Sequence, residues 1–154
     1  MTTTVTITGT GTPIPTPDRA GPGVLVTYEP PGGDSVRIQI DAGRGTVMRL
    51  LGAGTSPGDL DAVFLTHHHS DHLVGLDDLL LTRWVMDRTR SLPPLPVVAP
   101  AGPCTRFVGG LTERWSEDLA VRLTHAGREH GARACLVHSS RPSPAQLGQP
   151  GNGR

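Results

Sequence analysis

The sequence predicts an α/β fold, and three observations support this. Short stretches rich in β-branched residues alternate along the chain with stretches of helical character, a pattern typical of layered sheets and helices. At 154 residues the chain has room for one domain, or for part of a larger one. Apolar residues make up 36% of the chain, which together with 20 glycines is ordinary for a protein with a hydrophobic core.

Strands are expected where β-branched and other apolar residues form short or alternating runs. These runs cover residues 5–8, 24–28, 36–40, 62–65 and 95–99. The Pro- and Gly-rich residues 30–34 predict a hairpin connection between the second and third strands. Residues 9–15 contain two glycines and two prolines, which favours an irregular loop after the first strand.

Helices are expected over residues 46–53, 76–86 and 103–119. The first carries its apolar residues on one helical face, and the second is apolar enough to be buried. Pro103 suits the first position of the third helix, because a residue there needs no backbone N–H. The group Arg83, Trp84, Arg88 and Arg90 could face a substrate, but we favour a solvated helix end.

The last part of the chain differs in composition from the rest. No acidic residue follows Glu129, and residues 139–154 are mainly Ser, Pro, Gly and Gln with little to bury. We therefore expect a domain over residues 1–129 and a disordered or aberrant tail over residues 130–154.

Charge and cysteine content exclude several classes of protein. Fourteen basic residues balance fourteen acidic ones, so the net charge gives no argument for nucleic-acid binding. Cys104 and Cys135 cannot form a disulfide framework, and reduced thiols favour a cytoplasmic location. No apolar run approaches the roughly 18 residues of a membrane span, and the N-terminus lacks a leader pattern. We expect a cytoplasmic protein without a membrane partner.

Four residues with metal-ligating side chains follow the fourth expected strand: His67, His69, Asp71 and His72. Imidazole and carboxylate groups are the ones that hold Zn²⁺. Residues two apart in an extended segment point the same way, so His67 and His69 can reach one ion while His68 points elsewhere. Asp71 and His72 are adjacent and need a turned backbone, which favours a second ion about 3.5–4 Å from the first. The alternative is a chance histidine-rich surface loop.

The order Thr-His-His-His-Ser-Asp-His at residues 66–72 resembles the signature of the metallo-β-lactamase superfamily of metal-dependent hydrolases. Residues 9–19 resemble the opening of the branch that holds ribonuclease Z and the arylsulfatase-like phosphodiesterases. Asp41-Ala42-Gly43 resembles a turn that closes an early strand in that superfamily, and residues 73–84 also fit the branch. The resemblance covers residues 5–128.

The resemblance implies a four-layer αββα sandwich, of which we expect this chain to hold only the N-terminal half. Families with this motif supply further metal ligands well downstream, including a bridging aspartate. Here Asp118 is the only aspartate after Asp87, and it lies in an expected helix. His138, which follows the strand-like residues 134–137, is left open as a third histidine ligand. We expect one face of the sheet to lack the layer that would cover it.

The resemblance also implies the roles of the site residues. His67 and His69 belong to the first of one or two zinc ions, and Asp71 and His72 belong to the second. Asp71 is also assigned a catalytic role, and a metal-bound hydroxide is the implied nucleophile. Asp41 is expected to accept hydrogen bonds that hold the histidine loop in place.

The implied activity is zinc-dependent hydrolysis of phosphodiester bonds, including those at RNA 3′ ends as in ribonuclease Z, or of sulfate esters. The implied partner is accordingly a small ester substrate or an RNA 3′ end, and a homodimer is left open. The alternative from another class is a truncated, non-catalytic remnant with weak or no metal binding.

Overall fold

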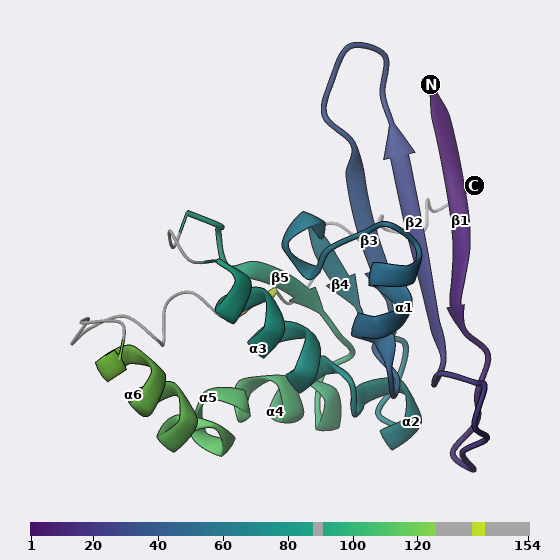
Figure 1. Ribbon diagram of the computed structural model, residues 1–154. Coiled ribbons are helices and arrows are strands. Elements are labelled where there is room, and N and C mark those ends of the chain that lie inside the picture. The colour runs from purple at the N-terminus through teal and green to yellow at the C-terminus, as the bar shows by residue number, and fades with distance from the viewer. Residues whose placement is uncertain (88–90, 126–136, 141–154) are drawn as a thin grey trace, which may run out of the picture.

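In the computed structural model, the protein forms one mixed sheet whose six strands lie side by side in chain order (Figure 1). The structure describes residues 1–87, 91–125 and 137–140. The strands are β1 (Thr2–Gly9), β2 (Gly23–Glu29), β3 (Val36–Ile40), β4 (Ala62–Phe64), β5 (Leu95–Val98) and β6 (Val137–Ser140).

The sheet combines an antiparallel part with a parallel part. β1, β2 and β3 pair antiparallel, and the β2–β3 pair confirms the hairpin predicted from residues 30–34. β3, β4, β5 and β6 pair parallel. Parallel neighbours need a crossover, and right-handed crossovers that advance in one direction bring all their helices to the same face.

The helices accordingly lie over one face of the sheet, where α1 and α3 stand in front of the strands in Figure 1. They are α1 (Thr46–Gly52), the 3-10 turn η1 (Pro57–Asp59), α2 (Ser70–Leu73), α3 (Leu76–Met86), α4 (Pro103–Gly109), α5 (Leu111–Arg114) and α6 (Ser116–His125). No described helix is both long and apolar enough to cross a membrane.

The hydrophobic core fills the space between these helices and the covered face of the sheet. The strands contribute Leu25, Val63 and Val97, all at most 3% exposed. α1 and α3 contribute fully buried leucines, among them Leu50 and Leu79. The core therefore holds β2–β5 against the helices and fixes the sheet edge at which the site is built.

Arg83 belongs to this interior, so the prediction of a solvated helix end is wrong. Its side chain is 6% exposed, and its guanidinium donates to the carbonyl oxygens of Pro57, Leu60 and Pro93 at 2.9–3.2 Å. Desolvation by burial lowers the pKa of Arg83. The long side chain satisfies carbonyl groups of the turn around η1, which a shorter residue could not reach.

The opposite face of the sheet is left uncovered by the described elements. Cross-strand pairing sets Ile7, Val24, Ile40, Phe64 and Val98 in one row across five strands. Ile7 is 58% exposed and Phe64 is 40% exposed, although both are large apolar residues. Among the described residues, no layer covers this face, as expected.

The end of the chain departs from the predictions in two places. The single helix expected over residues 103–119 is divided into α4, α5 and α6, because the chain leaves helical geometry near Gly110 and again at Trp115. Within residues 130–154, expected as a tail, the structure describes only β6, which pairs with β5. The remainder of that stretch lies outside the described residues.

Candidate metal centre

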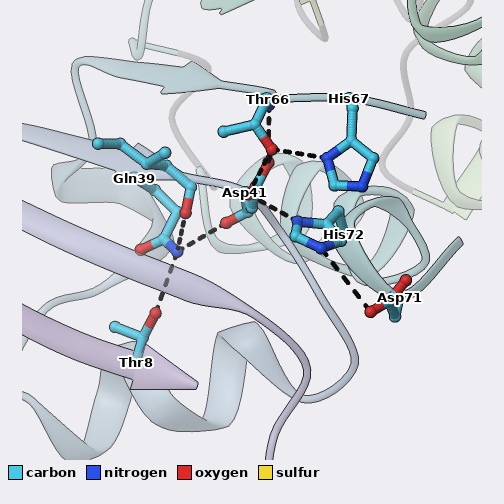
Figure 2. A network of polar contacts seen from close by, with 8 residues as sticks. Thr8, Gln39, Asp41, Thr66, His67, Asp71 and His72 are labelled. Atoms are coloured by element: carbon cyan, nitrogen blue, oxygen red, sulfur yellow. Dashed lines mark hydrogen bonds and ion pairs between the residues drawn. The ribbon is translucent and has the colours of Figure 1, made fainter. Parts of the chain in front are cut away.

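The candidate site lies at the edge of the sheet where the parallel strands β3 and β4 end. Asp41 directly follows β3, and the histidine segment 66–72 follows β4. The carboxyl ends of neighbouring parallel strands meet at one edge, which is where α/β sheets build their sites. Figure 2 shows Asp41, Thr66, His67, Asp71 and His72 gathered there.

Asp41 connects the two ends of the histidine segment. Thr66, before the histidines, donates its backbone N–H to Asp41 Oδ1 at 2.8 Å and its hydroxyl to Asp41 Oδ2 at 2.8 Å. His72, after them, places Nδ1 at 2.7 Å from Asp41 Oδ2. Asp41 is 6% exposed and adopts a positive φ of 57°, a conformation that aspartate tolerates better than most residues. The expected role of Asp41 in holding this loop is therefore visible as a set of short contacts.

These contacts assign the proton positions on two imidazole rings. A carboxylate only accepts, so His72 carries its proton on Nδ1 and donates it to Asp41. The Thr66 hydroxyl has one proton, which it donates to Asp41. Its oxygen therefore accepts a hydrogen bond from His67 Nδ1 at 3.0 Å. In its neutral form each ring therefore has its lone pair on Nε2, the form in which imidazole binds a metal ion.

The histidine rings lie close to one another. The ring centroids of His67 and His72 are 4.1 Å apart, and those of His67 and His69 are 4.5 Å apart. His68 is exposed, and its ring centroid lies 5.5 Å from that of His69. The site thus brings together three of the histidines of the motif.

Asp71 carries a buried oxygen without a partner. Its side chain is buried in α2, and Oδ1 has no hydrogen-bond partner within the described residues. Its other oxygen, Oδ2, lies 3.7 Å from His72 Nε2, which is too far for a hydrogen bond. A separation of this size would suit two metal ligands that bind the same small cation. α2 provides the turned backbone that adjacent ligands at Asp71 and His72 require.

The donor set fits zinc in kind. Imidazole Nε2 lone pairs and a buried, unsatisfied carboxylate oxygen are typical zinc ligands. In number the set falls short, because no three His, Cys, Asp or Glu side chains of the described residues are arranged to hold one ion. Catalytic zinc sites have three protein ligands beside their open position, so further donors are needed for a complete site.

Gln39 and Thr8 support the Asp41 turn through buried hydrogen bonds, and the sequence did not predict this role for either residue. Gln39 is fully buried on β3 and donates Nε2 to the Asp41 carbonyl oxygen at 2.7 Å and to Thr8 Oγ1 at 3.1 Å. β1, β3 and the Asp41 turn are thereby joined. The sequence feature that could have indicated this role is a polar glutamine within a strand, two residues before Asp41.

Two glycines allow the backbone segments of the site to approach closely. A Cβ at Gly43 would lie 2.5 Å from the Asp71 carbonyl oxygen, and a Cβ at Gly75 would overlap the Gly43 carbonyl group. Ala42 bonds to this region in both directions, since its N–H donates to His72 O and its carbonyl accepts from Gly75 N, each at 2.9 Å. The Asp41–Gly43 turn and α2 are therefore packed backbone to backbone.

Two further residues of interest are Cys104, which is buried, and His138, whose side chain lies outside the described part of the structure. Cys104 is 2% exposed, and burial, followed by the charge of Asp41, raises the pKa of its thiol. A buried, protonated thiol is a poor nucleophile. His138 lies on β6 opposite Pro96, but its side chain is outside the described part of the structure.

A family model described as the metallo-beta-lactamase superfamily matches residues 31–134, which include Asp41 and the whole histidine segment. The chain belongs to the metallo-beta-lactamase superfamily. It is ribonuclease Z-like within this superfamily, being 38% identical over 129 residues to a ribonuclease Z of Mycobacterium bovis, over 84% of this chain and 44% of that protein.

Solved metallo-beta-lactamase structures show the same fold. The human tRNase Z short form has a TM-score of 0.53 at 24% identity, covering 88% of this chain and 43% of that one. The metallo-beta-lactamase fold protein YhfI of Bacillus subtilis has a TM-score of 0.58 at 25% identity, and the match covers 70% of this chain and 42% of YhfI. The described structure is thus an α/β part of the metallo-beta-lactamase fold, and the chain spans less than half the length of these relatives.

Proposed function

We propose that this chain carries the first part of the metal centre of a zinc-dependent phosphodiester hydrolase that acts on RNA 3′ ends. One observation carries the proposal: Asp41 and Thr66 accept the Nδ1 protons of His72 and His67, which leaves Nε2 of each neutral ring free, and Asp71, whose Oδ1 has no partner among the described residues, places Oδ2 3.7 Å from His72 Nε2. The similarity to ribonuclease Z proteins supports the phosphodiester as the bond that is cleaved.

The protein residues have distinct tasks in this proposal. His67 and His69 hold one zinc ion, and Asp71 and His72 hold a second, while Asp41 keeps His72 in the ligating tautomer. Zinc bound by such donors supplies charge stabilisation at a phosphoryl oxygen and lowers the pKa of bound water to about 7. Asp71 is the one carboxylate of the motif, and its buried Oδ1, which has no partner among the described residues, would be available to an ion.

A non-catalytic remnant is the second candidate, and the shortage of ligands favours it. No group of three donors among the described residues is arranged to hold an ion, and the four residues of the motif give two proposed ligands for each zinc. Under this alternative, zinc binds weakly and no ester is hydrolysed.

The experiment compares zinc affinity and hydrolysis for the 154-residue chain and three variants. His67→Ala and Asp71→Ala each remove a proposed ligand, while His68→Ala is the matched control from the same segment. The proposal expects at least tenfold weaker zinc binding in the first two and unchanged binding in the control. Equal zinc affinity in all four proteins contradicts it.

Hydrolysis separates the two candidates. Turnover of bis-nitrophenyl phosphate and of an RNA with a 3′ extension, abolished by His67→Ala, supports the hydrolase. Zinc binding without turnover of either substrate favours the remnant. Turnover of nitrophenyl sulfate alone would move the activity to sulfate esters.

A further inference from the structure

We infer that Thr66 is a positioning residue for metal binding, whose hydroxyl links Asp41 to His67 and thereby sets the nitrogen with which His67 binds zinc. This rests on the proposed function, in which His67 is a zinc ligand, and it assigns a task to a residue outside the proposed ligands. One carboxylate then controls a histidine in each candidate zinc site: His72 by direct contact, and His67 through Thr66. Figure 2 shows the Thr66 side chain linked to both Asp41 and His67.

The backbone holds the Thr66 side chain at a fixed place beside Asp41. Thr66 follows β4, and its neighbour Leu65 donates its N–H to Val98 O at 2.8 Å, which continues the pairing of β4 with β5. The Thr66 N–H donates to Asp41 Oδ1 at 2.8 Å, and the Thr66 hydroxyl lies 3.0 and 2.8 Å from Oδ1 and Oδ2. Asp41 is buried, and its own N–H donates to Phe64 O at 2.7 Å. Both partners are therefore held by strand pairing as well as by each other.

The Thr66 hydroxyl has two neighbours that compete for its single proton. They are the Asp41 carboxylate and His67 Nδ1, which lies 3.0 Å from the hydroxyl oxygen. A charged oxygen is the stronger acceptor, so the proton goes to Asp41 and the hydroxyl oxygen accepts from His67. Within the described residues, Thr66 is the one hydrogen-bond partner of His67 Nδ1. The position of the proton on a neutral His67 ring therefore depends on Thr66.

The two histidines that share Asp41 reach it by different routes. His72 Nδ1 lies 2.7 Å from Asp41 Oδ2, whereas His67 is connected to the same carboxylate through the Thr66 hydroxyl. Linked hydrogen bonds polarise one another, so a hydroxyl bound to a carboxylate is a better acceptor than a free one. A ring that donates from Nδ1 to such an acceptor is a more basic ligand at Nε2. Loss of the hydroxyl should therefore weaken His67 as a ligand and leave His72 unchanged.

A purely structural role is the alternative, in which the hydroxyl only helps to hold the histidine segment in place. Thr46 provides the matched comparison, because its hydroxyl donates to Gly43 O at 2.8 Å beside the same turn and is buried. Within the described residues, Thr46 bonds to no histidine. Removal of the Thr46 hydroxyl therefore loosens the turn without changing the acceptor of His67.

The test records nitrogen NMR spectra of the zinc-free 154-residue chain at about pH 8, where an ordinary imidazole is neutral. The variants are Thr66→Val, which keeps the shape of Thr without its hydroxyl, Thr66→Ser, which keeps the hydroxyl, and Thr46→Val. We expect the His67 proton on Nδ1 in the unchanged chain, in Thr66→Ser and in Thr46→Val. In Thr66→Val we expect a mixture of Nδ1 and Nε2 forms, while His72 keeps its proton on Nδ1 throughout.

Competition with a zinc dye gives the second readout. Thr66→Val weakens zinc binding by at least about tenfold, as expected for loss of a group that supports a ligand. Thr66→Ser and Thr46→Val weaken it by less than about threefold, because the acceptor of His67 is retained. In a His67→Ala chain, adding Thr66→Val has no further effect on zinc affinity, since the ligand through which Thr66 acts is absent.

Three results would overturn the inference. They are a His67 proton that stays on Nδ1 in Thr66→Val, an equal shift of this proton in Thr46→Val, and a loss of zinc affinity in Thr66→Ser as large as that in Thr66→Val. Circular dichroism checks that each variant is folded, and Thr66→Ala replaces Thr66→Val if the latter is not. A chain that binds no zinc contradicts the proposed metal centre, whereas the proton on His67 still decides the role of Thr66.

Discussion

Replacing Asp41 by asparagine changes the chemistry of the site while keeping its shape. Asn tolerates the φ of 57° as well as Asp does, so the backbone turn is retained. The single oxygen of the amide can still accept from Thr66, but its NH₂ group then faces His72 Nδ1. His72 must move its proton to Nε2 in order to accept this bond, and it thereby loses the lone pair that would bind zinc.

The structure sets the magnitude of two effects. Three donors now converge on the carboxylate: the Thr66 N–H, the Thr66 hydroxyl and His72 Nδ1. Hydrogen bonds to a charged group contribute about 1.5–3 kcal/mol each, and neutral ones about 1 kcal/mol. Because Thr66 is partly solvated, we expect Asp41→Asn to lower the free energy of unfolding by about 2 kcal/mol. Loss of a supporting carboxylate weakens metal binding by about 10–100-fold.

Urea unfolding followed by circular dichroism measures the first effect, and competition with a zinc dye measures the second. Nitrogen NMR of the zinc-free chain reports which ring nitrogen of His72 is protonated. Asp61→Asn is the matched control. Asp61 also accepts a backbone N–H, from Arg37 at 2.7 Å, but it precedes β4, whereas Asp41 follows the end of β3. Unchanged zinc affinity together with a proton still on His72 Nδ1 would refute the reasoning.

Three further predictions concern single side chains. His69→Ala lowers zinc affinity at least tenfold, whereas His68→Ala changes it less than twofold, because alternation along an extended segment is expected to turn the His68 side chain away from the ions. Titration with zinc checks this, and equal losses would show that the register is wrong. Gln39→Leu lowers the free energy of unfolding by about 2–3 kcal/mol, because Thr8 and the Asp41 carbonyl lose a buried donor; a loss under about 0.5 kcal/mol in urea would contradict this. In a Cys135→Ser chain, Cys104 reacts with a thiol reagent at pH 8 only on unfolding, since burial raises its pKa; rapid labelling of the native protein would disprove it.

Local patterns predicted the order of the elements well. The bounds of β3 and α3 coincide with those expected from the sequence, because apolar spacing and flanking Gly or Pro decide such elements locally. The four predicted ligands, His67, His69, Asp71 and His72, also lie at one edge of the sheet. Their role as metal ligands stays a prediction, because no three of the possible ligands among the described residues are arranged around one ion.

Other features could not be read from spacing. Alternation in β3 shows that Ile38 and Ile40 share one face, but not that the helices cover the face of Gln39 instead. Which face is covered is decided by the crossover connections, a tertiary property. Arg83 was misplaced for a similar reason, because its carbonyl partners lie 10–26 residues away in sequence. Thr66 was missed as a structural residue, since its contacts become visible only when Asp41 is brought beside it.

The double attachment of the histidine segment to Asp41 has a consequence for the rate and cost of metal uptake. Thr66 and His72 are held by the same carboxylate, so the six-residue separation between them is closed as a non-covalent ring before any ion arrives. The conformational entropy of closing a short loop, which grows only slowly with its length, is then lost during folding and not during ion binding. A donor set ordered in this way retains more of its intrinsic affinity, because less of the binding energy is used to order the chain. Zinc should therefore associate with the folded chain in a single fast phase, without a slower step of loop ordering.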